Sequence, residues 1–197
     1  CRPHMTGRNC SAPKQNYFIH QLHLVQEAEM SELCLPHGNN GNCSIVPQPL
    51  PNDREPDWTG IGFIRIPENS EVTITVNDIP RSMPYDVQVR YLLPSRDTWE
   101  DATITLIRPD EVDPEGECAQ LVPPGSSVYE TRVPFRLPDR ERQVVALHNV
   151  CLEAGKVYKF KIHFKRRHHN EDNPQATILI DSLTLIPRIE VTSIFAG

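Results

Sequence analysis

Hydrophobic and polar residues alternate along many short segments of this chain. In residues 71–77, three apolar β-branched residues alternate with polar ones, and residues 85–91 and 157–164 follow the same period of two. Because successive side chains of a β-strand project to opposite faces, each segment has one face to bury and one face for water. Further segments of strand character are residues 16–22, 61–66, 102–107, 132–137, 143–147 and 176–186. About eight to ten such segments predict an all-β fold, an antiparallel β-sandwich.

Nineteen prolines punctuate the chain. Proline lacks a backbone donor and interrupts both helices and central strands. No proline-free window with helical periodicity is long enough for a major helix, and the best candidate, residues 24–33, predicts one or two helical turns. The stretch 108–131 has little strand character, which predicts a long loop that is functional or simply variable.

The chain contains six cysteines, at Cys1, Cys10, Cys34, Cys43, Cys118 and Cys151. Six cysteines allow fifteen pairings, among which the sequence does not choose. Proximity favours Cys1 with Cys10 and Cys34 with Cys43, which leaves Cys118 with Cys151 to tie the long loop to the sandwich. A metal site is the alternative, but the chain has no CxxC pair and its histidines are scattered.

Two sequons begin at Asn9 and Asn42, and both asparagines are candidate glycosylation sites. A cysteine occupies the middle position of each sequon, which is a poor context for glycosylation. Sequons and paired cysteines together favour an oxidising environment, and hence a secreted, extracellular protein.

Composition excludes several classes of function. The net charge of −6 argues against a nucleic-acid partner, because phosphate binding needs a surplus of clustered lysine and arginine. No apolar run approaches the length of a membrane span, so membrane insertion is not expected. The sequence contains no GxSxG or HExxH motif and no cysteine beside a plausible base, which predicts that this is not an enzyme.

Three carboxylates are candidate metal ligands. Glu27 and Glu29 are two residues apart, so on an extended strand they would project to the same side, with Ala28 facing the core. Asp181 interrupts the otherwise apolar segment 176–186, and a buried carboxylate needs donors or a cation. If the first and last strands are neighbours, these three side chains offer oxygen ligands to one structural calcium ion. The alternative is that Asp181 caps a turn and both glutamates are solvated.

Two further features allow a glycan-binding interpretation. Residues 165–173 are rich in Lys, Arg and His, which suits heparan sulfate or an acidic lipid. Two acidic residues follow at once and strand patterns flank the segment, which favours a solvated hairpin tip. Trp58 and Trp99 flank predicted strands. An exposed tryptophan ring would stack on a sugar, whereas a covered ring would complete the core. Glycan or proteoglycan binding through a sheet face or loop tips is therefore the alternative to a purely structural function.

Several quoted segments together resemble the internal globular domain of laminin β chains, known as LF or laminin IV type B. "CRPHMTGRNC" is similar to the end of a laminin EGF-like repeat. It is followed in order by "EAE", "WTGIGFIRIPE", "NDIPRSMPYDVQVRY", "WEDATITLIRP" and "LIDSLTLIP". Cys118 and Cys151 also fall where the family places a pair. Residues 34–43 depart from the family pattern as a local addition with its own cysteines.

The resemblance implies two units: residues 1–13 as the end of an EGF-like repeat, and residues 14–197 as the LF domain, lacking a terminal segment. It implies a jelly-roll-like β-sandwich, similar to the galactose-binding-like carbohydrate-binding modules, several of which hold a structural calcium. It further implies a non-enzymatic structural domain in the short arm of a laminin β chain, within basement membrane and serving cell adhesion. The expected partners are laminin α and γ chains, through a region outside this chain, and matrix or cell-surface glycoproteins.

Overall fold

The computed structural model describes residues 5–6, 12–13, 23–31, 33–36, 43–48, 58–94, 99–122, 130–165 and 177–188. One set of strands comprises β3 (Leu24–Glu27), β5 (Ser44–Pro47), β6 (Gly62–Pro67), β8 (Met83–Leu92), β11 (Gln143–Leu152) and β13 (Thr177–Pro187). A second set comprises β4 (Leu33–Pro36), β7 (Ser70–Val76), β9 (Trp99–Ile107), β10 (Glu130–Leu137) and β12 (Tyr158–Lys165). A separate short pair is formed by β1 (Met5–Thr6) and β2 (Ala12–Pro13).

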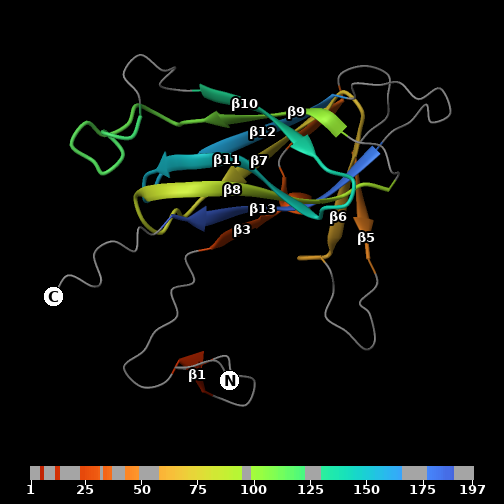
Figure 1. Ribbon diagram of the computed structural model, residues 1–197, viewed down its shortest axis with the longest axis horizontal. Helices are drawn as coiled ribbons and strands as arrows, with labels where there is room; N and C mark the ends of the chain where they lie inside the picture. The colour runs from red at the N-terminus through yellow and green to blue at the C-terminus, as the bar shows by residue number, and fades with distance from the viewer. Residues whose placement is uncertain are drawn as a thin grey trace.

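The first two sets form two sheets that face each other (Figure 1). The β13 sheet has the order β11-β8-β13-β6-β5, and β3 also pairs with β13. The β12 sheet has the order β10-β9-β12-β7-β4. Every described strand pair is antiparallel. The predicted all-β antiparallel sandwich is therefore confirmed.

Alternating apolar side chains of the two sheets form the core. On β7 and β12 the buried inward positions are Val72, Ile74, Val76, Tyr158, Phe160, Ile162 and Phe164. Strands β8 and β9 contribute further buried apolar residues at alternating positions, whereas β13 is buried along most of its length. Each fully buried large apolar side chain contributes roughly 1.5–3 kcal/mol, so this shared interior stabilises the sandwich.

Three core tyrosines are buried, and the hydroxyl group of each has a hydrogen-bond partner. Tyr85 donates to the carbonyl of Arg81 at 2.9 Å, and Tyr91 donates to the carbonyl of Pro138 at 2.8 Å. The hydroxyl oxygen of Tyr158 accepts a bond from the Glu153 N–H at 2.8 Å. A buried tyrosine needs such a partner, so these rings link the core to the connecting turns.

The observed elements differ from the predicted ones in two places, and a third prediction is not tested. Residues 24–33, predicted to form one or two helical turns, instead form β3, the short 3-10 helix Ala28–Met30 and the start of β4. The expected helical turn is limited to the 3-10 helix because Leu24–Glu27 pairs with β13, and pairing with a distant strand overrides local propensity. β4 and β5 were not predicted as strands. The strand predicted at 16–22 lies outside the described residues.

Strand β13 has different neighbours along one of its edges. Residues 177–180 pair with β6, whereas residues 182–185 pair with β3. Asp181 falls between them. On the opposite edge, Ile180 pairs with Tyr91 and Ser182 with Arg90, so Asp181 is an extra residue in the ladder. Such a bulge bends a strand and re-aims its side chains, which directs the Asp181 carboxylate into the gap between β6 and β3.

The long loop after β9 is held against the sandwich, as predicted. A disulfide joins Cys118 to Cys151 on β11, with the Cα atoms 5.4 Å apart. Arg108 donates to the Cys151 carbonyl at 3.0 Å, and the Glu153 carboxylate accepts a bond from the Asp113 N–H at 3.0 Å. These bonds attach the loop to the end of β11 at several points.

Lys156 adds an ion-paired contact between the same loop and β11. Its ammonium group lies 2.7 Å from Asp110 and 2.9 Å from Glu153. Burial by itself lowers the lysine pKa, but the hydrogen bonds to Asp110 and Glu153 outweigh it and raise the pKa to about 12. Lys156 therefore stays charged at every physiological pH.

The remaining cysteines and the sequons are described only in part. Cys43 is disulfide-bonded. The side chain of Cys34 on β4 is not described, and Cys1 and Cys10 lie outside the described residues, as do Asn9 and Asn42. The two pairings proposed from proximity, the two glycosylation sites and the boundary at residue 13 therefore stay predictions. In the described ranges, no helix has the length and apolar character needed to cross a bilayer.

Candidate functional site

Three carboxylates converge at the gap beside β13. Glu27 ends β3, Glu29 lies in the 3-10 helix that follows, and Asp181 is the bulged residue of β13. The turn Thr59–Ile61, which leads into β6, reaches into the same gap. We call these three carboxylates and this turn the acidic junction. Sequence analysis had placed the three carboxylates together, and the pairing of β3 with β13 explains why they meet.

Donors on the turn satisfy part of the acidic junction. The Thr59 N–H donates to Asp181 Oδ1 at 2.8 Å, and the Ile61 N–H donates to Glu29 Oε1 at 2.7 Å. The Thr59 hydroxyl lies 2.7 Å from Glu27 Oε2 and 3.1 Å from Asp181 Oδ2. Because one hydroxyl has one proton, it serves only one carboxylate at a time. Glu29 Oε2 is buried without a hydrogen-bond partner. The junction is therefore short of positive charge and of donors.

One expectation about the acidic junction was wrong. Glu29 lies on a 3-10 helix, so Glu27 and Glu29 do not project to the same side of one extended strand, as had been expected. They meet because the chain turns after Glu27, and Ala28 is fully buried as expected. The alternative interpretation is right in one respect, because Asp181 does hold a turn. Nothing in the sequence pointed to Gly60. Its φ of +61°, which the turn beside the carboxylates requires, is visible only in the structure.

The electrostatics of the acidic junction disfavour its full charge. Arg90 is the facing cation, with Nη1 3.5 Å from Asp181 Oδ2. Burial raises the pKa of Asp181, against the opposing effect of the Thr59 N–H and Arg90. Burial, with a further contribution from Glu29 and Asp181, also raises the pKa of Glu27. Three carboxylates and one guanidinium leave two negative charges in excess if all are ionised.

The raised carboxyl pKa values predict a pH dependence of stability in calcium-free buffer. A carboxyl with a raised folded-state pKa destabilises the fold above that pKa, and this cost disappears as the pH falls towards the ordinary values of 3.8 for Asp181 and 4.5 for Glu27. We expect wild type to gain stability relative to Asp181→Asn as the pH falls from about 7 towards the ordinary Asp181 value of 3.8. Denaturant unfolding of both proteins measures this difference. A constant difference across that range contradicts the prediction.

The donor set of the acidic junction suits a hard cation, although it is not pre-assembled as a metal site. Carboxylate oxygens are the ligands that calcium prefers, and Glu29 Oε2 is an oxygen without another partner. Within the described ranges, however, no three His, Cys, Asp or Glu side chains are gathered as a metal site. A cation therefore fits the chemistry of the junction only if the carboxylates exchange hydrogen bonds with the turn for bonds to the ion.

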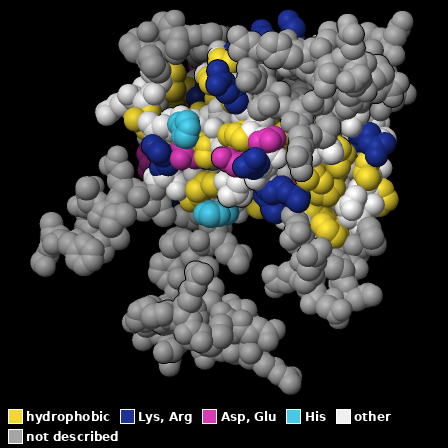
Figure 2. Space-filling view, turned by 45° about the vertical axis from the view of Figure 1, so that its right-hand side comes forward, with side chains coloured by type: hydrophobic (Ala, Val, Ile, Leu, Met, Phe, Trp, Pro, Cys, Tyr) yellow, Lys and Arg dark blue, Asp and Glu magenta, His cyan; other side chains and the backbone are white. Residues whose placement is uncertain are grey.

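The rim of the acidic junction is apolar. Met30 and Ile61 follow directly on the helix and the turn, and they are 70% and 64% exposed. Trp58 packs against Phe63 with ring centroids 6.4 Å apart, so Trp58 covers β6. Figure 2 shows charged side chains over one face of the molecule and hydrophobic side chains gathered at the right of that view. The other tryptophan considered, Trp99, has no described side chain.

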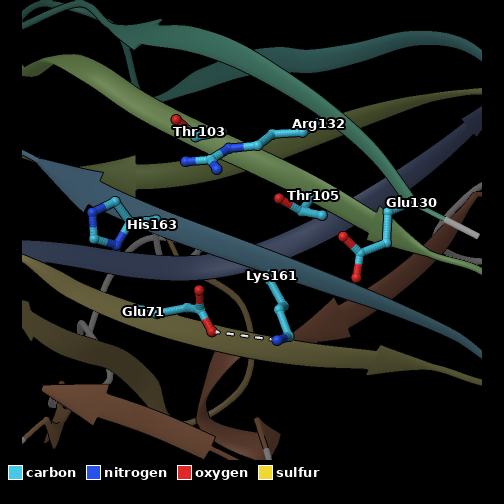
Figure 3. Close-up of a pocket in the computed structure, with 7 residues that line it drawn as sticks. All are labelled: Glu71, Thr103, Thr105, Glu130, Arg132, Lys161 and His163. Atoms are coloured by element: carbon cyan, nitrogen blue, oxygen red, sulfur yellow. Dashed lines mark ion pairs between the residues drawn. The ribbon is translucent and has the colours of Figure 1, made fainter. Parts of the chain in front are cut away.

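A polar groove lies on the outer face of the β12 sheet. Its lining residues come from β7, β9, β10 and β12: Glu71, Thr103, Thr105, Glu130, Arg132, Lys161 and His163 (Figure 3). Its volume is about 340 Å³. We call it the polar groove. The alternation in residues 157–164 assigned Lys161 and His163 to the polar face, whereas Glu130 fell in the predicted loop 108–131, and no sequence signal indicated that the face is hollowed.

The strand register explains how the polar groove is built. Thr73, Lys161, Thr105 and Arg132 are directly paired across β7, β12, β9 and β10. Since paired residues share a face, this row crosses the sheet on its outer side. Glu71 and Lys161 form an ion pair at 3.7 Å, and Figure 3 shows Arg132 extending over β9 towards Thr103. The groove thus combines cations, carboxylates and hydroxyls within one surface.

The fold and these sites define a disulfide-linked antiparallel β-sandwich domain with an acidic junction and a polar groove. The profile of the Laminin IV type B domain family matches residues 23–197, so the chain belongs to this family.

Relatives of the chain include laminin β subunits. Laminin subunit beta-1 of Drosophila melanogaster is 63% identical over 187 residues, covering 94% of this chain and 10% of the relative. Laminin subunit beta-1 of Mus musculus is 32% identical over 197 residues, covering 99% of this chain and 10% of the relative. The chain therefore spans about a tenth of the length of these curated relatives.

Solved structures similar to this chain include two carbohydrate-binding modules. CBM35 from Paenibacillus barcinonensis has a TM-score of 0.41 and 16% identity, covering 84% of this chain and 99% of the module. The C-terminal CBM6 of LamC from Zobellia galactanivorans has a TM-score of 0.37 and 14% identity, covering 83% of this chain and 98% of the module. These are similarities of fold.

Proposed function

We propose that this chain is a non-enzymatic structural domain in the short arm of a laminin β chain. The observation that carries the proposal is the family match over residues 23–197, together with relatives that are laminin β subunits. On this proposal the parent protein is secreted into the extracellular matrix and basement membrane and supports cell adhesion. It assembles with laminin α and γ chains through a region outside this chain, and contacts to matrix or cell-surface glycoproteins are made along the arm.

The architecture supports a mechanical role. Two sheets share one apolar core, and the long loop is covalently tied to β11 by the disulfide of Cys118 and Cys151. A cross-link restricts the unfolded chain, and a shared core makes unfolding cooperative. Such a domain resists local opening and so suits a fixed globule inserted in an extended arm.

A domain-replacement experiment tests the structural role. A whole β chain lacking residues 23–197 is co-expressed with α and γ chains, beside a version in which an unrelated β-sandwich of similar size fills the gap. We expect both trimers to be secreted. Incorporation into matrix is expected to fall on deletion and to recover on replacement. Failure of trimer assembly on deletion, or no recovery with the replacement domain, contradicts a purely structural role.

We further propose that Glu27, Glu29 and Asp181 hold a structural calcium ion. The support is the excess of negative charge at the acidic junction, the carboxylate chemistry and the unpartnered Glu29 Oε2. When bound, the ion supplies positive charge that the junction otherwise lacks. Thr59 and Arg90 then serve to orient the carboxylates from the turn and from β8.

Calcium addition and chelation give the test. Saturation at about 100-fold above the dissociation constant is expected to stabilise the fold by about 2.7 kcal/mol. Asp181→Asn keeps the size of the side chain and an acceptor for the Thr59 N–H but removes one charge, so we expect it to abolish the calcium effect. Thermal unfolding of both proteins, with calcium and with chelator, measures this. A melting temperature of wild type that is unchanged by chelator contradicts the proposal.

A further inference from the structure

The polar groove is unlike an ordinary ligand pocket in its lining. Ligand pockets of roughly 300–1,000 Å³ are lined mostly by hydrophobic and aromatic side chains. The polar groove has about 340 Å³ and every one of its lining residues is polar or charged. The core of a protein interface is also apolar, with aromatic residues enriched and charged ones depleted. The groove therefore does not match a hydrophobic ligand or the core of a protein–protein contact.

The cations of the outer face select for anionic groups. Among the described side chains that project outward from β10 and β12, Lys159, Lys161, Lys165, Arg132 and Arg136 are basic. The described acidic side chains of the face are Glu71 and Glu130, and Glu71 already pairs with Lys161. Among the described side chains of this face, cations therefore outnumber carboxylates, on a chain whose net charge is −6. A basic patch on an acidic molecule attracts anions selectively.

The carboxylates and hydroxyls of the polar groove select for donors as well. Glu71 and Glu130 only accept hydrogen bonds when ionised, whereas Thr103 and Thr105 both donate and accept. A phosphate chain brings anions but few donors for the glutamates. A neutral sugar brings hydroxyls but no anion for Arg132. An oligosaccharide with sulfate or carboxylate groups brings both on neighbouring atoms.

We propose that the polar groove binds an acidic oligosaccharide of the glycosaminoglycan type. Arg132 and Lys161 hold sulfate or carboxylate groups, and Arg132 offers the paired donors that suit such oxygens. Glu71, Glu130 and the threonines bond the sugar hydroxyls. The row of paired residues across β7, β12, β9 and β10 spans about 14 Å at ordinary strand spacing, which gives room for a short chain of sugars. This goes beyond the proposed structural role and stands independently of it.

Nuclear magnetic resonance titration of the chain with heparin-derived hexasaccharide, at about 0.1 M salt, tests the proposal. We expect amide shifts concentrated in β9, β10 and β12, and not in β8 or β13. A hyaluronan hexasaccharide, which carries carboxylates without sulfates, shows whether the groove requires sulfate or also binds carboxylate alone. Shifts confined to other strands, or no binding of either oligosaccharide, overturn the proposal.

Matched variants identify the residues responsible. The double variant Arg132→Gln, Lys161→Gln is expected to weaken binding by about tenfold or more, because both charged hydrogen-bond donors to the anionic groups are lost. Arg140→Gln, in the exposed turn after β10, removes a charge away from the groove and is expected to change affinity by no more than about twofold. Equal losses in the two proteins overturn the proposal. A polyglutamate peptide that binds as tightly as the hexasaccharide also overturns it, in favour of an acidic protein partner.

Discussion

Replacing Cys118 and Cys151 together by alanine is expected to lower the free energy of unfolding by about 3–4 kcal/mol. The disulfide joins positions 33 residues apart, so its loss frees a long loop in the unfolded chain. Both cysteines are buried, and alanine avoids placing an unpartnered polar group there. The melting temperature should fall by roughly 10 °C for a domain of this size. Denaturant and thermal unfolding of the double variant measure the loss.

The non-covalent anchors of the same loop supply the control. Lys156→Met removes the ion pairs to Asp110 and Glu153 while leaving the disulfide in place. Because these pairs are partly exposed, we expect a loss of about 1 kcal/mol or less. The two variants thus separate covalent restriction of the unfolded chain from bonding in the folded loop. A disulfide loss no greater than that of Lys156→Met contradicts the first prediction.

Gly60→Ala is expected to destabilise the fold by about 2–4 kcal/mol, through two separate costs. Gly60 has a φ of +61°, a conformation that disfavours any side chain. A Cβ atom at this position would overlap Glu29 Oε1 and lie 3.1 Å from Glu27 Oε2. Glu29 must then move and lose its bond to the Ile61 N–H. The variant should also weaken any calcium effect, since it displaces one of the three carboxylates.

Gly155 provides a matched control for Gly60. Its φ is +73°, and a Cβ atom there meets nothing within 4 Å. Gly155→Ala therefore carries only the backbone cost, which we expect to be about 1 kcal/mol. Denaturant unfolding of the two alanine variants compares the two positions directly. Equal losses would show that the contact with Glu29 contributes nothing.

Much of the sandwich could be predicted from local patterns. Residues 71–77 and 157–164 alternate, and they form β7 and β12 with their apolar residues buried. The alternation is strong evidence because it reflects the geometry of a single strand. Residues 24–33 hold only one short helical turn because Leu24–Glu27 pairs with β13, a partner far along the chain. Propensity within a short window contains no information about such a partner.

The acidic junction was predictable in its members and unpredictable in its geometry. Asp181 stood out because a carboxylate within an apolar strand needs a partner. Its partners, however, are Thr59 and Arg90, which no motif connected to it. Thr59 reaches Asp181 because β6 gives way to β3 along one edge of β13, and Arg90 reaches it because β8 pairs with the other edge; both are properties of sheet order.

The sequence by itself determined which residues face the core, which face water, and the family to which the chain belongs. These depend on periods and spacings within short segments, which any strand must obey. Only the tertiary structure decided that Glu29 leaves the strand, that Gly60 lies against it, and that the outer face of the β12 sheet is hollowed between Arg132 and Lys161. The physical reason is that pairing register and sheet order bring together residues remote in the chain, and no local pattern records those distances.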